Sequence, residues 1–460
     1  MTMTKDVVQS VLAVVRHPVL AIAMVAAPTI VMASVVVIAG LIANLSTRVK
    51  RHIGGYVNTF GIPSLKSNEQ MSKTITFIVT KDCQLACKYC YLIGKNNKER
   101  MSWDVAKQAI DYILSHEDDF QDEGIIWDFI GGEPFLEIDL IDKICDYLKE
   151  QMFTRNHHWF NDYMFSFTTN GLNYQSEKLQ KYIAKNIDHL SITITIDGTE
   201  RKHDLNRIYK GSGKGSYKDV VKNIPLWLKQ FPTVGTKITI SSEDIPYIKE
   251  SVMHVYGLGI TDVHINCVFE DVFKDGDDLL FEEQVEALAD EIIDNDYYKD
   301  HVCSFFDESI GKPLDPVKRN NNWCGAGRML SIDAAGNFYP CTRFAQYSLR
   351  DKKAWIIGNV NDGIDQNKLR PFLLLDRCTQ SPQKCIDCEV ASGCAWCQGE
   401  NYDAAEIPTL YQRATAICKM HKAQVRANNY YWNKLYRKLE LEGLREEFEE
   451  NRPVSNQEMC

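Results

Sequence analysis

The 460-residue sequence predicts an α/β fold with a parallel sheet, followed by a small cysteine-rich domain and preceded by an apolar helix. Between residues 74 and 281, short runs of β-branched and aromatic residues alternate with helical patterns, which is typical of β/α units. After residue 324 cysteines recur at short spacings, and near the N-terminus a long stretch carries no charge. Because the length exceeds that of one ordinary domain, we expect four parts. They are 1–70, 71–300, 301–425 and 426–460.

The N-terminal part contains the uncharged stretch 18–45, which is longer than the roughly 20 apolar residues needed to span a bilayer. Three basic residues follow at 48–51, against two before it, and this excess predicts that the rest of the chain lies on the cytoplasmic side. We therefore expect a transmembrane helix that anchors a cytoplasmic protein to the inner membrane. A buried hairpin interrupted at Pro28 and an appended foreign segment are the alternatives.

Six strand-like runs follow in the second part. The helical stretches between them, such as Trp103–Ser115 and Ile138–Gln151, place apolar residues three and four apart. Strands connected in this way form a parallel sheet with right-handed crossovers, so their carboxyl ends meet at one edge. The predicted strands are Thr74–Val79, Ile125–Ile130, Tyr163–Thr169, Leu190–Ile196, Lys237–Ser241 and Asp262–Phe269.

Net charge and cysteine usage limit the class of partner. The formal charge of −10 argues against the basic surface that nucleic acids require, so we expect a peptide or small-molecule partner. The chain has 15 cysteines, and seven of them lie three or four residues from another cysteine, in metal-type spacings. This pattern favours thiolate ligands in a reducing compartment over disulfides.

The most informative motif is a loop of three cysteines, Cys83, Cys87 and Cys90, directly after the first strand. Such a loop can bind one face of a [4Fe-4S] cube and leave the fourth iron open. Zinc fits poorly, because no fourth Cys or His lies nearby. With Tyr89 just before the third cysteine, the loop resembles that of the radical S-adenosylmethionine (SAM) superfamily. In that superfamily the open iron binds SAM, and its reductive cleavage releases a 5′-deoxyadenosyl radical.

The resemblance implies a partial (β/α)6 barrel with its chemistry at the carboxyl ends of the strands. Gly131-Gly132-Glu133-Pro134, after the second strand, resembles the family's GGEP turn, which receives the amino group of SAM. The third strand ends in a further family-like turn, in which Thr169 is expected beside the cofactor.

After the fourth strand, Thr195-Ile-Asp197-Gly198 and His203-Asp204-Leu-Asn-Arg207 are similar to a stretch of peptide-modifying radical SAM enzymes. The similarity implies that Thr195 hydrogen-bonds the ribose of SAM and that Arg207 reaches its carboxylate. The family often has Ser where this chain has Thr195, a change that keeps the hydroxyl. We expect His203 and Asp204 to brace a loop or cap a helix.

The third part resembles the SPASM domain, which carries two auxiliary [4Fe-4S] clusters in radical SAM enzymes. The pattern implies seven ligands where two fully ligated cubes need eight, so the nearer cluster has an open iron unless Cys378 completes it. The spacing between Cys394 and Cys397 is one residue shorter than the family commonly has. A pair of zinc ribbons is the alternative. The implied ligands are Cys385, Cys388, Cys394 and Cys418 for the distal cluster and Cys324, Cys341 and Cys397 for the nearer one.

The stretch from Cys394 to Asp403 looks like that of maturases that form thioether crosslinks in cysteine-repeat precursor peptides. This resemblance implies a Cys-rich precursor peptide as substrate and a low-potential ferredoxin or flavodoxin as electron donor. Two alternatives stay open: another peptide-modifying radical SAM reaction, such as sulfatase maturation or carbon–carbon crosslinking, and a membrane-tethered iron–sulfur electron-transfer protein. The final segment, Tyr430–Glu450, predicts an amphipathic surface helix.

Overall fold

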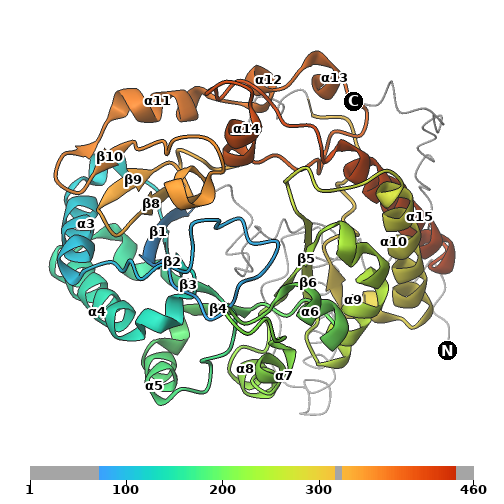
Figure 1. Cartoon of the computed structure of the whole chain (residues 1–460), viewed down its shortest axis with the longest axis horizontal. Coiled ribbons are helices and arrows are strands. Elements are labelled where there is room, and N and C mark those ends of the chain that lie inside the picture. Colours follow the sequence, from blue (N-terminus) through green and yellow to red (C-terminus); the bar gives the residue numbers. More distant parts are fainter. Residues whose placement is uncertain (1–71, 316–323, 442–460) are drawn as a thin grey trace, which may run out of the picture. The chain divides into compact units, whose positions relative to one another are not determined.

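In the computed structural model, which describes residues 72–315 and 324–441, strands and helices alternate from β1 to β6 (Figure 1). This arrangement confirms the predicted α/β class. The strands are β1 Lys73–Thr80, β2 Ile125–Gly131, β3 Tyr163–Thr169, β4 Leu190–Ile194, β5 Thr236–Ile240, β6 Asp262–Cys267, β7 Val302–Cys303, β8 Leu330–Ile332, β9 Asn337–Tyr339, β10 Gly358–Asn359 and β11 Gly363–Ile364. The helices are α3 Trp103–Ser115, α4 Ile138–Thr154, α5 Glu177–Asn186, α6 Glu200–Asn206, α7 Tyr217–Val221, α8 Ile224–Gln230, α9 Ile248–Gly257, α10 Asp277–Asp294, α11 Gln366–Leu374, α12 Arg377–Gln380, α13 Gln383–Ile386, α14 Gln398–Ala404 and α15 Cys418–Lys438.

The strands do not form the single parallel sheet that the sequence predicts. Strands β1 to β4 pair in parallel, and β5 and β6 pair in parallel within a separate three-stranded sheet. At the seam between β4 and β5 the hydroxyl of Thr236 donates to the carbonyl of Ile194 (2.7 Å) and accepts from the amide of Ile196 (3.2 Å). One side chain thus satisfies backbone groups that a continuous ladder would have paired.

The cysteine-rich part continues the first sheet. Strand β8 pairs in parallel with β1, from Ile75 opposite Leu330 to Phe77 opposite Ile332. Strands β9, β10 and β11 follow in antiparallel register, which gives the eight-stranded order β11-β10-β9-β8-β1-β2-β3-β4. All the described residues belong to one contact-defined unit. The cysteine-rich part is therefore joined to the barrel by backbone hydrogen bonds as well as by side-chain packing.

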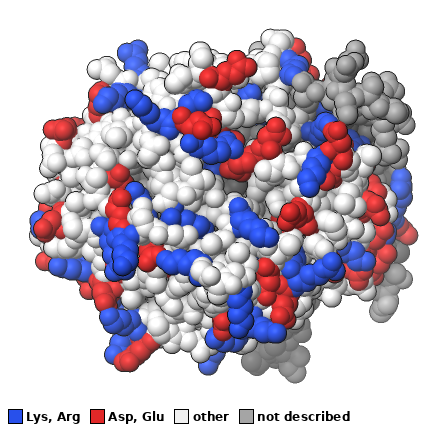
Figure 2. All heavy atoms as spheres, in the orientation of Figure 1, with Lys and Arg blue, Asp and Glu red and all other residues white. Residues whose placement is uncertain are grey.

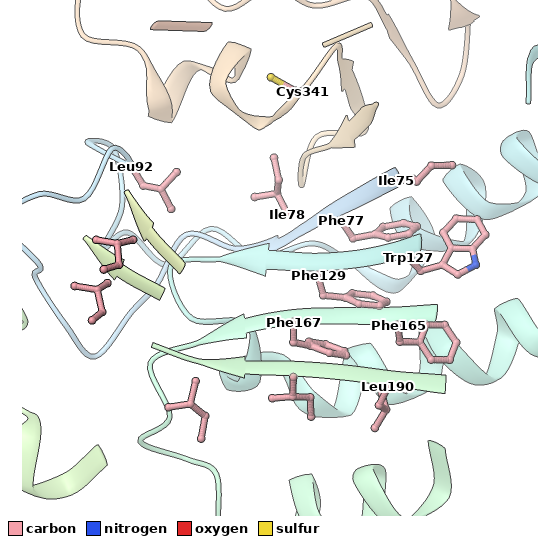
Figure 3. Close-up of a cluster of buried hydrophobic side chains, with 14 of the residues drawn as sticks. Ile75, Phe77, Ile78, Leu92, Trp127, Phe129, Phe165, Phe167, Leu190 and Cys341 are labelled. Carbon is pink, nitrogen blue, oxygen red and sulfur yellow. The ribbon is translucent and has the colours of Figure 1, made fainter. Parts of the chain in front are cut away.

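The core between the sheet and its outer helices is aromatic (Figure 3). Phe77, Phe129 and Phe167 stack across β1, β2 and β3, with ring centroids 5.7 and 5.1 Å apart. In β2, buried Trp127 and Phe129 alternate with the less buried Ile126, Asp128 and Ile130, because successive side chains of a strand point to opposite faces. The outer face of β2 thus supplies the aromatic core, and its inner face carries Asp128 between two isoleucines.

The C-terminal helix differs from its prediction. Helix α15 spans Cys418–Lys438, whereas the sequence predicts a helix over Tyr430–Glu450 that starts in the fourth part. It lies beside α10 (Figure 1), and Tyr431, Trp432 and Leu435 are buried. A largely buried ion pair, Arg426 of α15 with Glu282 of α10 (2.6 Å), also joins the two helices. Helix α15 is an integral helix of the unit.

The predicted membrane segment 18–45 lies outside the described residues. Within 72–315 and 324–441, none of the helices is both long and apolar enough to cross a bilayer. On the face shown in Figure 2, Lys and Arg side chains are interspersed with Asp and Glu. Several of them form ion pairs, such as Lys185 with Asp146 (2.9 Å).

Candidate active site

The cysteine loop leaves the carboxyl end of β1 and is fastened to the segment after α6. The amide of Ala86 donates to the carbonyl of Ile208 (2.8 Å), and the amide of Lys88 donates to that of Asn206 (3.1 Å). Cys83 is buried, whereas Cys87 and Cys90 are partly exposed. Electrostatic interactions link the Cys87 thiol to those of Cys83 and Cys90, and burial raises the pKa of Cys83 to about 11. The structure therefore brings the three predicted ligands together on one short loop.

Gly131 and Gly132 lie against the start of this loop, which explains why both positions lack a side chain. A Cβ on Gly131 would come within 2.3 Å of the Thr80 carbonyl oxygen, and one on Gly132 within 2.1 Å of the Asp82 carbonyl oxygen. Real Cβ atoms do not approach backbone so closely, so any other residue would displace the loop. Two backbone bonds hold this contact, from Gly132 to Thr80 (3.0 Å) and from Glu133 to Asp82 (2.8 Å).

The Glu133 carboxylate braces the ends of β2 and β3. It accepts the Thr169 hydroxyl (2.7 Å), the Asn170 amide (2.8 Å) and the Phe135 amide (3.2 Å). Burial raises its pKa, and Pro134 begins the short helix that follows it. The side chains of Glu133 and Thr169 are thus engaged with each other. This bracing role was missed in the sequence, where both appear only as cofactor-facing residues.

Tyr89, Arg207 and Asp197 form a second polar group beside the loop. The Tyr89 hydroxyl donates to the Asp197 carboxylate and accepts from Nη1 of Arg207 (2.9 Å). The Nε of Arg207 is buried and has no hydrogen-bond partner within the described residues. Such an orphan donor needs an acceptor, and a carboxylate suits a guanidinium best. Thr195 is buried at the end of β4. The unpartnered Nε of Arg207 suits a carboxylate such as that of SAM, while the role of Thr195 at the ribose stays a prediction.

A fully buried lysine supports this group from behind. The Nζ of Lys202 lies 3.7 Å from Asp197 and 3.5 Å from Asp244, and it donates to the Thr239 carbonyl (2.5 Å). Although burial opposes ionisation, Lys202 and Arg207 lower the pKa of Asp197. Nothing in the sequence signals this arrangement, because Asp244 is far along the chain from Asp197 and Lys202.

His203 and Asp204 brace the loop, as expected. His203 accepts the Asp197 amide (3.3 Å) and contacts the Ser216 hydroxyl (3.0 Å), and burial lowers its pKa to about 3. Asp204 accepts the amide of Tyr217 (2.8 Å).

Cys324, Cys341 and Cys397 form one group, the near cysteine group. The Cys324 and Cys397 thiols hydrogen-bond each other, and both interact electrostatically with Cys341. Amides of Gln398 and Glu400 point at Cys324 (3.4 Å) and Cys397 (3.5 Å).

Arg343 connects the near cysteine group to the cysteine loop. Its guanidinium lies 4.8 Å from the ring of Tyr91, which directly follows Cys90, and binds Glu270 (2.9 Å) and Glu400 (3.0 Å). Burial and the Cys341 and Cys90 thiols raise the pKa of Tyr91, while Arg343 opposes this rise. Tyr91 therefore lies between the cysteine loop and the near cysteine group.

Cys385, Cys388, Cys394 and Cys418, the distal cysteine group, line one cavity of about 380 Å³, the distal cavity. Arg377, Arg413 and His421 line it as well. The structure records Cys418 in a disulfide, so Cys418 can act as a cluster ligand only in its reduced form. Cys378 is partly exposed on α12, beside Arg377, and stays an unassigned candidate for an eighth ligand.

The three cysteine sets suit iron–sulfur cubes by their donor chemistry, since thiolates are the usual protein ligands of such clusters. Across residues 72–315 and 324–441, no three Cys, His, Asp or Glu side chains are gathered closely enough to ligate one metal ion. A cube spreads its cysteines over separate iron atoms, so this finding concerns single-ion sites.

A further cavity of about 400 Å³, the loop cavity, separates the cysteine loop from the cysteine-rich part. Its lining includes Cys90 and Tyr91 from the loop, Glu243 and Glu270 from the barrel, and Arg350 and Asp403 from the cysteine-rich part. Tyr91, Ile93 and Val272 add apolar surface to it, with 37%, 54% and 43% of their area exposed. It can accept a molecule with both apolar and polar groups beside the cysteine loop.

Asp128 and Lys237 lie on the inner face of β2 and β5. Asp128 accepts the Thr76 hydroxyl (3.1 Å), and burial raises its pKa to about 6. Burial also lowers the pKa of Lys237, which Asp128 partly offsets. Side chains of a strand alternate between its two faces, and both of these charged residues fall at inner-face positions. A charge at such a position is the sequence signal that could have identified them.

Comparison with known proteins agrees with this geometry. Residues 77–252 match the Radical SAM superfamily. The uncharacterized protein MJ0907 of Methanocaldococcus jannaschii is 33% identical over 42% of this chain and 61% of its own length. The radical SAM cyclopropyl synthase TigE of Paramaledivibacter caminithermalis is 22% identical over 73% of this chain and 69% of its own length. The antilisterial bacteriocin subtilosin biosynthesis protein AlbA of Bacillus subtilis is 24% identical over 69% of this chain and 62% of its own length. The chain thus spans about three fifths to two thirds of these relatives.

Among solved structures, anSMEcpe with bound AdoMet aligns with a TM-score of 0.58 and 17% identity, covering 80% of this chain and 96% of that one. A structure of anSMEcpe with AdoMet and the Kp18Cys peptide aligns with a TM-score of 0.57 and 16% identity, covering 80% and 99%. At 16–17% identity, this similarity shows that the chain shares its fold with anSMEcpe. Residues 77–252 of this chain thus form a radical SAM domain, as their match to that superfamily shows.

Proposed function

We propose that this protein is a radical SAM peptide maturase that forms thioether crosslinks in a ribosomally made Cys-rich precursor peptide. The observation that carries the proposal is the loop cavity, which is lined by Cys90 on one side and by Arg350 and Asp403 on the other. A peptide bound there would lie between the cysteine loop and the cysteine-rich part. The name of one relative, a bacteriocin biosynthesis protein, supports a peptide substrate, because bacteriocins are peptides.

The residues that follow the carboxyl ends of β1 to β4, here called the barrel end, would bind and orient the cofactors. Cys83, Cys87 and Cys90 would hold a [4Fe-4S] cluster, and the orphan Nε of Arg207 would bind the SAM carboxylate. With SAM bound, that cluster would supply a 5′-deoxyadenosyl radical able to remove a hydrogen atom from the substrate. The Tyr89 and Asp197 pair orients Arg207 for this task. A low-potential ferredoxin or flavodoxin would supply the electron.

The near cysteine group supports thioether chemistry in particular. Three thiols lie together there, and a cube with three protein ligands leaves one iron for a substrate thiolate. Arg343, held by Glu270 and Glu400, lies beside Cys397 and lowers the pKa of that thiol together with the Cys324 hydrogen bond. The distal cysteine group would hold the other auxiliary cluster.

Carbon–carbon bond formation is a second candidate, favoured by the similarity to the cyclopropyl synthase. The two reactions differ in the fate of the substrate cysteines, which are consumed in a thioether but survive a carbon–carbon bond.

The test is an anaerobic reaction of the reconstituted holoenzyme with SAM, a reductant and the Cys-rich peptide encoded beside it. Thioether formation predicts the loss of two hydrogen atoms per crosslink and cysteines that no longer react with an alkylating agent. The same mass loss with fully alkylatable cysteines would replace the thioether by a carbon–carbon bond. An unchanged peptide would overturn the substrate proposal.

Two variants provide matched controls. Cys87→Ala should abolish release of 5′-deoxyadenosine, because Cys87 belongs to the predicted cluster loop. Cys267→Ala should leave it unchanged, because Cys267 lies outside all three cysteine sets at the end of β6.

A further inference from the structure

Two arginines face the distal cavity from different elements. Arg377 begins α12 and Arg413 lies in the loop before α15, and their side chains are only 5% and 8% exposed. Both line the cavity that the distal cysteine group surrounds. Burial and the nearby Arg413 lower the pKa of Arg377. Two like charges are therefore buried side by side.

Their hydrogen bonds go to neutral acceptors and to one sulfur. Arg377 donates from Nη2 to the Ala391 carbonyl (2.8 Å), and its Nε is buried without a partner in the described part of the chain. Arg413 donates to the Ser381 hydroxyl (3.0 Å) and the Ala395 carbonyl (3.3 Å). From Nη2 it also donates to the Cys394 sulfur (3.2 Å).

Three other buried or half-buried arginines are neutralised by carboxylates. Arg343 binds Glu270 and Glu400, Arg350 binds Glu400 and Asp403, and Arg426 binds Glu282. Within residues 72–315 and 324–441, neither Arg377 nor Arg413 forms an ion pair with a carboxylate. Glu389 is the acidic residue among the cavity's lining, and it is exposed, whereas Lys384 and Lys422 add positive charge.

Burying an uncompensated guanidinium costs several kcal/mol, so this pair calls for an anion in the cavity. A [4Fe-4S] cube of charge 2+ held by four thiolates has a formal net charge of about −2, which the two guanidiniums would match. Cluster reduction potentials rise when hydrogen bonds reach the sulfurs and when the local net charge becomes more positive. The Arg413 bond to Cys394 and the charge of Arg377 act in that direction.

We infer that Arg377 and Arg413 are positioning residues for the distal iron–sulfur cluster: they neutralise its charge in the buried cavity and raise its reduction potential. The inference rests on the iron–sulfur part of the proposed function and not on thioether formation.

The test measures the midpoint potential of the distal cluster in the reconstituted holoenzyme by redox titration followed with electron paramagnetic resonance. Cys385→Ala identifies the distal signal and should lower the iron content by one cluster. Arg413→Gln and Arg377→Gln should each make that midpoint more negative. Arg426→Gln, which removes an arginine of α15 that has a carboxylate partner away from the cavity, should leave it unchanged.

A variant that fails to retain the cluster also gives an answer. If Arg413→Gln loses the distal iron, Arg413→Lys should restore the iron content, because it keeps the charge. An unchanged midpoint in both glutamine variants, or unchanged iron content in Cys385→Ala, would overturn the inference. Neither readout uses a peptide, so a failure of the peptide proposal would be seen separately, as an unmodified substrate with the potentials still shifted.

Discussion

The barrel end and the distal cavity handle buried charge in opposite ways. At the barrel end, Lys202 lies between Asp197 and Asp244, and Tyr89 joins Asp197 to Arg207. In the distal cavity, Arg377 and Arg413 face cysteines and neutral groups. The first set is largely balanced by the chain itself, so it can fold before any cofactor arrives. The second set is balanced only when an anion fills the cavity.

The largest expected effect comes from breaking the balanced set. Lys202→Met would leave Asp197 and Asp244 buried without their cation and should destabilise the protein by about 3–5 kcal/mol. Chemical denaturation measures it. The matched variant is Lys178→Met, which breaks the exposed pair with Asp139 and should not change stability measurably. Equal losses in the two variants would contradict the contrast.

Asp128 is intermediate between the balanced charges of the barrel end and the unbalanced charges of the distal cavity. Its carboxylate accepts a hydrogen bond, but its negative charge is poorly compensated. Burial raises its pKa from 3.8 to about 6, so the folded state holds a proton that the unfolded state releases between these values. The stability contributed by this group is therefore present at low pH and is lost as the pH rises through about 6. Asp128→Asn should remove this fall, on the order of 2–3 kcal/mol between pH 4 and 7.

Denaturation at several pH values tests this prediction. Asp139→Asn on the exposed surface serves as the control and should follow the parent protein. A parallel pH dependence in the parent and in Asp128→Asn would show that Asp128 does not titrate in this range.

Removal of iron should separate the two regions directly. In the cluster-free protein the amides of α12 should exchange with solvent at least about tenfold faster than in the holoenzyme, since Arg377 and Arg413 lose their counter-ion. The amides of α6, which carries Lys202, should change less. Hydrogen exchange followed by mass spectrometry compares the segments within one sample. Equal changes in both would mean that the barrel end also depends on iron.

The smallest effect is expected for Tyr89→Phe. The ring stays, but the hydroxyl that joins Asp197 to Arg207 is lost. Its hydrogen bonds contribute about 1 kcal/mol to holding Arg207 in its orientation. SAM binding, measured by calorimetry, should weaken about fivefold at unchanged iron content. Tyr209→Phe, whose hydroxyl binds Asp219 on the surface side, is the control.

Much of the barrel could be predicted from the sequence because its signals are local. The six strands have ends within two residues of their prediction, and the Gly131-Gly132 pair marks a close backbone approach. The break between β4 and β5 could not be predicted, because it depends on one hydroxyl, that of Thr236, meeting a strand distant in sequence.

The candidate site divides in the same way. The three cysteine sets follow from spacing and resemblance, and the structure gathers the members of each. The supporting charges come from pairs such as Lys202 with Asp244, or Arg377 with Arg413, which are separated along the chain and look like ordinary surface residues in the sequence. Glu133 shows a further limit: its motif predicts a place beside the cofactor, but nothing local in the sequence reveals that its oxygens also hold the end of β3.

The pairing of β8 with β1 sets a spacing as well as a fold. Strand β1 leads into the cysteine loop, and β8 and β9 lie between Cys324 and Cys341 in the chain. Electron tunnelling slows steeply with distance, and a shift of one residue along a ladder would flip every side chain of the strand. The register of β8 along β1 therefore fixes the distance between the cysteine loop and the near cysteine group, and with it the distance between any clusters that the two would hold.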